Sequence, residues 1–292
     1  EYGLEPHRLT RLLNSLGARE TPPPLQVFLT THSPVAVREL NGNQLFVVRG
    51  HPTAPHLVLP VGISDDIQST VRADPEAFLA RSVIVCEGAS EVGLIRGLDH
   101  YWTSLNGNSM LSAGTAFVNV GGGEPDRCFV RGLALSRLGY RVLVLVDADK
   151  PPTPATVEAF EAAGGEHITW RAGRALEDEL FMSLPVAGVD ALLQRGIELM
   201  EEELVAAHIQ TQSNGQVTLA HIRQQRHLIG GPYSPEIRQL LGLTARNRRN
   251  GWFKSVTRYE DVAHDILGPH LPASDAGFQA LISRLYWWAH AA

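Results

Sequence analysis

Four carboxylates occupy positions in this sequence at which they could bind a metal ion. Glu87 and Glu91 follow one apolar stretch, and Asp147 and Asp149 follow another. Side chains two residues apart in an extended chain point to the same side, which places Asp147 beside Asp149. Carboxylates that converge repel one another unless a cation neutralises them, and hard divalent cations such as Mg²⁺ take oxygen ligands. Either motif alone also suits a turn or a helix cap, but the two together favour a metal site.

Strands and helices are expected to alternate between residues 82 and 170, with the acids where two strands end. Continuous apolar runs separated by helical segments are typical of a parallel sheet covered on both faces. Functional residues of such sheets gather at the carboxyl ends of the strands. The fold class is therefore α/β. The expected strands are 82–86, 115–120, 141–146 and 167–170, and the expected helices are 90–98, 126–138 and 155–163.

The segments on either side of this alternation have other patterns. After Pro185 the sequence predicts helices alone, at 189–209, 219–228, 235–250, 252–267 and 275–291. Before residue 82 it predicts helices at 6–16, 35–40 and 65–80, the last broken at Pro75, and strands at 25–30, 44–49 and 56–61. A length of 292 residues suits about two domains. We divide the chain into residues 1–75, 81–184 and an all-helical 185–292.

Charge is unevenly distributed along the chain. Its 25 basic and 31 acidic residues give a net charge of −6. The segment from His221 to Arg258 contains eight basic residues and one acidic residue, a net +7, which leaves −13 for the rest. Arginines that follow a phosphate backbone suit a DNA partner, whereas we expect Trp252 to be a core residue. The expected DNA-binding residues are Arg246, Arg248, Arg249, Lys254 and Arg258.

Several protein classes are disfavoured by missing signals. Cys86 and Cys128 form no CxxC motif, which argues against a disulfide framework and a structural zinc. No HExxH or GxSxG motif occurs, which disfavours zinc and serine hydrolases. No apolar run approaches the ~18 residues that span a bilayer, and no signal peptide is recognisable. We expect a cytoplasmic protein with no membrane partner.

The order of the acids resembles the Toprim domain, which topoisomerases, primases and certain nucleases share. Its pattern is a glutamate after the first strand, matched by Glu87, and a later Asp-x-Asp, matched by Asp147 and Asp149. The sequence Glu-Gly-Ala-Ser-Glu from Glu87 to Glu91 is more similar to the OLD (overcoming lysogenization defect) family of nucleases than to topoisomerases. The resemblance implies a Rossmann-like Toprim fold and covers residues 82–182 best.

OLD proteins carry an ABC-type ATPase ahead of the Toprim domain, and the first residues of this chain resemble its end. Glu1 to His7 resembles the stretch after a Walker B strand, and Leu29 to Pro34 resembles the strand with the switch histidine. No GxxxxGK[ST] motif occurs in the chain. The resemblance implies that residues 1–75 are an ATPase remnant and linker. It also implies a bacterial source, homo-oligomers formed through the ATPase of a longer protein and, for some members, a superfamily-one helicase partner in phage defence.

The resemblance further implies a DNA endonuclease or nickase that hydrolyses phosphodiester bonds with two metal ions, Mg²⁺ or Mn²⁺. OLD-like nucleases have an acidic motif similar to residues 176–180, and an important lysine beyond the Toprim core. Lys254 matches that lysine, and Lys150 is its competitor. The implied catalytic residues are Glu87, Glu91, Asp147, Asp149 and Lys254. The implied metal ligands are Glu87, Asp147 and Asp149 for one ion, and Glu91 and Glu177 for the second, with Glu179 a further candidate.

Other functions could use the same acids. The chain could be a regulatory module that binds metal and DNA without cleaving it. It could also be a receiver-like domain in which Asp147 accepts phosphate, although no lysine follows the strand expected to end at Trp170. A primase or a topoisomerase would share the Toprim fold.

Overall fold

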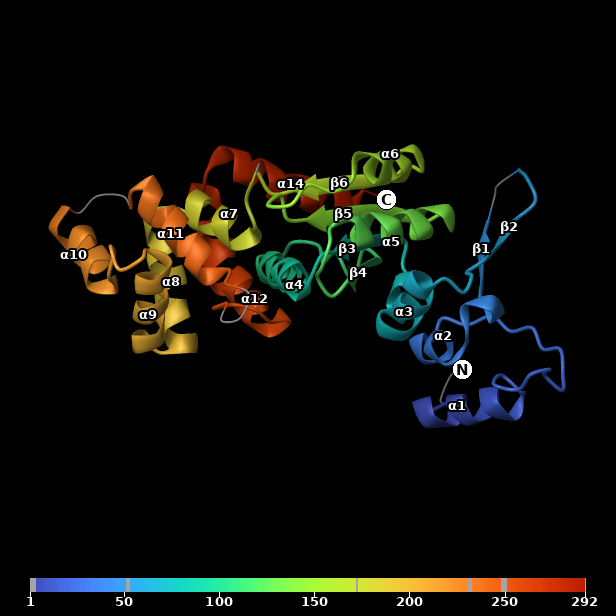
Figure 1. The fold of residues 1–292 in the computed structure, drawn as a ribbon. Helices are drawn as coiled ribbons and strands as arrows, with labels where there is room; N and C mark the ends of the chain where they lie inside the picture. The colour runs from blue at the N-terminus through green and yellow to red at the C-terminus, as the bar shows by residue number, and fades with distance from the viewer. Residues whose placement is uncertain (1–3, 51–52, 172, 230–232, 248–250, 292) are drawn as a thin grey trace.

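The computed structural model describes residues 4–50, 53–171, 173–229, 233–247 and 251–291, with the backbone alone for 225–229. The chain is elongated (Figure 1). The parallel sheet lies in the middle, the N-terminal helices lie at one end, and helices of the C-terminal half lie at the other. No helix within the described ranges is long and apolar enough to cross a membrane.

A four-stranded parallel sheet forms the centre of the fold, as the sequence predicts. In sequence order its strands are β3 (Ser82–Cys86), β4 (Thr115–Asn119), β5 (Arg141–Val146) and β6 (Glu166–Thr169), and their order in the sheet is β4-β3-β5-β6. Cys86 pairs with Leu145, so β3 and β5 are neighbours that end at the same edge. The residues that follow these two strands therefore meet.

Helices cover both faces of this sheet. Val83 and Val85 pack into one buried cluster, which contains residues of α3 (Asp65–Ala73), α5 (Asp126–Arg137) and α6 (Pro154–Ala162). Ile84 and Cys86 point the other way, into a second cluster with residues of α4 (Ala89–Ser104) and α7 (Leu176–Ser183). Burial on both faces explains why the strands are apolar at every position rather than at alternate ones.

Helix α4 packs directly against α12 (Val256–Val262), which a π-helical turn, Ala263–Leu267, continues. A Cβ atom at Gly93 would lie 2.3 Å from the carbonyl oxygen of Val256, and one at Gly97 would lie 2.1 Å from that of Glu260. Both distances are too short for any side chain. The two glycines thus let the backbones touch, and α4 begins at the strand end that carries Glu87.

Residues beyond 185 are helical, with boundaries that differ from the expected ones. The single helix expected at 189–209 is two helices, because Glu201 between them has a φ of 70°, which ends the first helix. The helices expected at 235–250 and 252–267 are shorter, and the second begins only at Val256. The helices are α8 (Val186–Met200), α9 (Glu202–Gln212), α10 (Leu219–Ile229), α11 (Pro235–Ala245), α12, α13 (Gly268–His270) and α14 (Ala276–His290).

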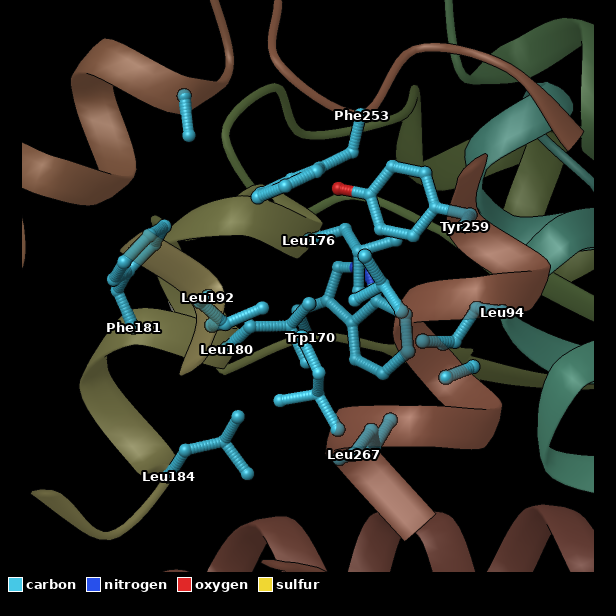
Figure 2. Packing of buried hydrophobic residues seen from close by; sticks show 14 of the residues in the cluster. Leu94, Trp170, Leu176, Leu180, Phe181, Leu184, Leu192, Phe253, Tyr259 and Leu267 are labelled. Carbon is cyan, nitrogen blue, oxygen red and sulfur yellow. The ribbon is translucent and has the colours of Figure 1, made fainter. Parts of the chain in front are cut away.

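These helices and the sheet share one hydrophobic core. Trp170 at the end of the sheet lies in the same buried cluster as Phe181, Leu192 and Tyr259 (Figure 2). Trp252 belongs to it and is fully buried, which confirms the expected core role. Packing is therefore continuous across residue 185, and the division there stays a prediction.

The N-terminal region departs from one expectation. The expected strand 25–30, which carried part of the resemblance to an ATPase, has no regular secondary structure, and Phe28 in it is 86% exposed. A strand needs a neighbour to bond its backbone groups, and the described residues supply none here. The first three residues of the other ATPase-like motif lie outside the described ranges. The observed elements are α1 (Pro6–Ser15), α2 (Pro34–Glu39), the hairpin β1 (Phe46–Arg49) with β2 (Leu57–Pro60), and α3 followed by a 3₁₀ turn, Pro75–Phe78.

Candidate metal centre

Glu87 and Asp147 meet where β3 and β5 end. The backbone N–H of Asp147 donates to Oε2 of Glu87 over 3.2 Å. Oδ1 of Asp147 in turn accepts from the backbone N–H of Leu176, the first residue of α7, over 3.1 Å. These two bonds join two strand ends to the start of α7. The expected convergence of Glu87 and Asp147 is therefore present.

Glu91 lies in the first turn of α4 and is 4% exposed. Its Oε2 accepts from the N–H of Gly88 over 2.8 Å, so the carboxylate caps the helix whose positive end it occupies. Burial raises the pKa of Glu91 from 4.5 to about 7, and the charges of Glu177 and Glu87 act in the same direction. Glu91 thus faces two other acids from a site that water scarcely reaches.

The same mutual repulsion extends to the remaining acids. Burial raises the pKa of Asp147 well above its usual range, and the charges of Glu91, Glu177 and Glu87 raise it further, followed by that of Asp149. Burial also raises the pKa of Glu87. We call these five residues the acidic cluster: Glu87, Glu91, Asp147, Asp149 and Glu177.

Glu177 comes to the cluster from α7, where it is 5% exposed. Burial raises its pKa, while the hydroxyl of Tyr259 and the charge of Lys254 act against that rise. The Tyr259 hydroxyl is buried without a fully formed hydrogen bond among the described residues. Glu177 is therefore a buried acid and not part of a solvent-exposed helix start.

The two lysines lie near different acids. Lys254 is exposed and lowers the pKa of Glu177. Lys150 lowers the pKa of Glu87, and its Nζ donates to Oε1 of Glu124 over 3.2 Å. Each lysine therefore borders the acidic cluster.

Asp178 is a neighbour of the cluster that sequence reasoning missed. Its Oδ2 accepts from the N–H of Ala175 over 3.2 Å and pairs with Nη1 of Arg246 over 3.1 Å. The same Nη1 lies 3.2 Å from Oδ2 of Asp149. Arg246 was expected on the DNA-binding surface, and the structure places it against the acids. The signal that could have found Asp178 was its place next to Glu177 in the acidic motif of residues 176–180.

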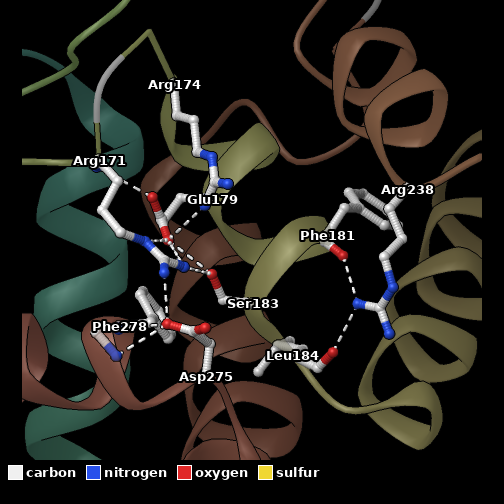
Figure 3. Close-up of polar contacts among 10 residues, drawn as sticks. Arg171, Arg174, Glu179, Phe181, Ser183, Leu184, Arg238, Asp275 and Phe278 are labelled. Carbon is white, nitrogen blue, oxygen red and sulfur yellow. Dashed lines mark hydrogen bonds and ion pairs between the residues drawn. The ribbon is translucent and has the colours of Figure 1, made fainter. Parts of the chain in front are cut away.

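The structure corrects the expectation that Glu179 is a metal ligand. Glu179 is fully buried, and its carboxylate accepts from Arg171, Arg174 and Ser183 (Figure 3). The shortest of these ion pairs, with Nη2 of Arg171, is 2.6 Å long. These partners lower the pKa of Glu179 against the effect of burial. Its charge is satisfied within the protein, so it anchors α7 and leaves no carboxylate oxygen for a metal.

Arg238 fixes the other end of α7. Its Nη1 donates to the carbonyl oxygens of Phe181 and Leu184 over 2.8 and 2.7 Å (Figure 3). Carbonyl groups in the last turn of a helix lack partners within the helix. Arginines therefore bond α7 at Glu179 and at its last turn, which helps to hold the helix that carries Glu177 and Asp178.

Of the remaining arginines expected to bind DNA, the structure describes Arg258 alone. Arg258 donates through Nη1 to the carbonyl oxygen of Trp252 over 3.2 Å, which secures the loop before α12. Arg248 and Arg249 lie outside the described residues.

The sequence that carries these acids matches one protein family. Residues 78–149 match the family model of the Toprim domain of overcoming lysogenization defect protein-like proteins. The chain contains an OLD-like Toprim domain. The match begins just before β3 and includes Glu87, Glu91, Asp147 and Asp149, whereas Glu177 and Lys254 lie beyond it. A comparison with curated proteins finds no match.

The donor set of this Toprim domain suits a hard divalent cation. Toprim domains bind divalent metals, and this assignment supports a metal-binding function of the nuclease or primase type. Within the described ranges, no three His, Cys, Asp or Glu side chains are already arranged around one metal position. The fit therefore rests on chemistry: buried carboxylates that raise one another's pKa offer oxygen ligands and an excess of negative charge.

Proposed function

We propose that this Toprim domain is a divalent-metal-dependent deoxyribonuclease that hydrolyses phosphodiester bonds. The observation that supports this most directly is the convergence of the acidic cluster at the edge of a parallel sheet. Repulsion among Asp147, Glu91 and Glu177 has no structural benefit by itself. A bound cation would neutralise these charges and offset their repulsion.

In this proposal the acidic cluster holds two ions, Mg²⁺ or Mn²⁺. Glu87, Asp147 and Asp149 hold the first, and Glu91 with Glu177 holds the second. Two such ions, when bound, supply a hydroxide nucleophile and neutralise charge on the leaving oxygen. The protein contributes fixed orientation: the N–H groups of Asp147 and Leu176 hold the Glu87 and Asp147 carboxylates.

The DNA substrate is supported by the positive charge of residues 221–258. Its seven arginines and one lysine give the segment a net +7, which suits a phosphate backbone. Nicking or double-strand cleavage, oligomers formed through an ATPase, and a helicase partner in phage defence are proposals that rest on the resemblance to OLD proteins.

The deciding experiment compares plasmid cleavage by three variants. With Mg²⁺ or Mn²⁺ present, we expect Asp147→Asn and Glu87→Gln to abolish nicking, because each removes a ligand charge but little volume. Asp65→Asn, an exposed acid on α3, is the matched control and should cleave as the wild type does. Full cleavage by Asp147→Asn would overturn the proposal.

Lys254 is proposed to stabilise the charge that develops on the scissile phosphate. Loss of one such group costs about 10²-fold in rate. We expect Lys254→Ala to lower the cleavage rate about 100-fold without weakening DNA binding to the same extent. Lys150→Ala should lower the cleavage rate by a smaller factor. Single-turnover cleavage and filter binding measure the two effects. If Lys150→Ala is the more damaging variant, the roles of the two lysines are reversed.

A receiver-like phosphoacceptor has less support. A receiver needs a lysine at the end of a later strand, and none follows β6 directly. Incubation with acetyl phosphate followed by mass spectrometry should leave the chain unmodified. Phosphorylation at Asp147 would favour the receiver over the nuclease.

A further inference from the structure

Arg246 forms ion pairs with two acids next to the proposed metal site. Its Nη1 lies 3.2 Å from Oδ2 of Asp149 and 3.1 Å from Oδ2 of Asp178. The Arg246 side chain is 29% exposed. One guanidinium nitrogen thus joins the Asp-x-Asp loop after β5 to the first turn of α7.

The position of Arg246 follows from close packing between α11 and α7. A Cβ atom at Gly242 would lie 2.8 Å from Cα of Asp178, so the two helices touch there. Arg246 comes one turn later, and its N–H donates to the carbonyl oxygen of Gly242 over 3.0 Å. The side chain therefore starts directly beside Asp178 and needs little freedom to reach Asp149.

Asp149 cannot serve Arg246 and a metal ion equally well. The oxygen that accepts from Arg246 is a lone-pair donor that a divalent cation would also use, and two cations at one carboxylate repel each other. Asp178 offers no such conflict, because its side chain can keep the arginine when Asp149 is taken. The guanidinium of Arg246 and a metal ion therefore compete for Asp149.

We infer that Arg246 couples metal binding to DNA binding; this inference rests on the proposed function. Without metal, Nη1 of the guanidinium is shared between Asp149 and Asp178, which holds the side chain against the acids. When Asp149 becomes a metal ligand, Nη1 keeps only Asp178, and the other nitrogens of the guanidinium bind a phosphate of DNA. A guanidinium binds phosphate through two parallel N–H bonds, which suits this second role.

The first test is calorimetric titration of the protein with Mn²⁺ in the absence of DNA. Removal of a competing cation should tighten binding, so we expect Arg246→Ala to bind Mn²⁺ about fivefold more tightly than the wild type, the low end of typical coupling between sites. Arg246→Lys should fall between them, and it keeps a charge at the position if Arg246→Ala folds poorly. Arg223→Ala, which removes an exposed partner of Glu202, controls for a change of net charge.

The second test measures duplex DNA binding in EDTA and in Ca²⁺, a cation with similar oxygen ligands. Ca²⁺ should strengthen binding by the wild type and by Arg223→Ala to the same extent. For Arg246→Ala we expect the Ca²⁺-dependent gain to be about fivefold smaller, because linkage makes the coupling reciprocal.

Each outcome decides a separate question. Tighter Mn²⁺ binding and a smaller Ca²⁺ gain in Arg246→Ala support the coupling. Equal or weaker Mn²⁺ binding by Arg246→Ala, with normal cleavage by the wild type, overturns the coupling and leaves the nuclease standing. A wild type that binds Mn²⁺ with the expected Arg246 dependence but never cleaves DNA overturns the nuclease alone. No Mn²⁺ binding by the wild type overturns both.

Discussion

At the scale of single residues, the acidic cluster is a set of carboxylates held in an unfavourable place. Burial raises the pKa of Glu91, Asp147, Glu87 and Glu177, and each charge raises the pKa of its neighbours. Lys254, Lys150 and Arg246 border the cluster as cations. Glu179, two residues from Glu177, shows the contrast: arginines surround it, and they lower its pKa. Proximity in sequence therefore does not predict a shared role.

The raised pKa of Glu91 predicts how the stability of the metal-free protein changes with pH. Its pKa is 4.5 when unfolded and about 7 when folded, so the folded state binds the proton more tightly. The resulting stability is fully present below about pH 4.5 and is lost as the pH rises through about 7. Urea unfolding in EDTA from pH 5 to 8 should show a smaller decline for Glu91→Gln, whose amide oxygen can still cap α4. An identical decline in both proteins would contradict the burial of Glu91 as a charged group.

At the scale of elements, the site depends on helices that touch without intervening side chains. Gly93 and Gly97 bring α4 against α12, and Gly242 brings α11 against α7. The first contact brings Tyr259 and, just before α12, Lys254 to the acids. The second places Arg246. Small residues at helix crossings therefore position groups from the C-terminal helices at the edge of the sheet.

Gly93→Ala tests the first of these contacts. The added methyl group would meet the carbonyl oxygen of Val256, so α12 must shift. We expect a loss of about 1–3 kcal/mol in the free energy of unfolding, with a fall in cleavage rate larger than the loss of folded protein explains. Arg96→Ala, at an exposed position of the same helix, is the control and should change neither by much. Wild-type stability and rate in Gly93→Ala would contradict the close contact.

At the scale of the whole molecule, one buried cluster unites the sheet with the C-terminal helices. It extends from Ile84 in β3 to Trp252 and to Trp288 in α14. A smaller cluster of Leu9, Leu13 and Ala36 joins α1 to α2, whose Val37 packs with Val83 and Val85 of the sheet. We therefore expect residues 82–291 to unfold together and α1 to be more independent.

Trp252→Ala tests this cooperative unit. Truncation of a fully buried tryptophan costs about 3–5 kcal/mol. If the core is shared, hydrogen exchange should accelerate at the β3 and β5 amides as well as in α8 and α11. Leu13→Ala, in the separate N-terminal cluster, should leave β3 and β5 unchanged. Faster exchange confined to the C-terminal helices in Trp252→Ala would instead favour an independent domain after residue 185.

The parallel sheet and the acids at its edge could be predicted from the amino-acid pattern alone. Hydrophobic runs identify buried strands, and Glu87 and Asp147 are fixed to the ends of those strands by the chain itself. Which other groups reach these two acids depends on how the helices pack. Glu177 reaches the cluster, Glu179 is tied to Arg171, and Arg246 bonds Asp149, because α7 and α11 pack in one particular orientation. Local spacing cannot specify that orientation, since it results from contacts between segments distant in sequence.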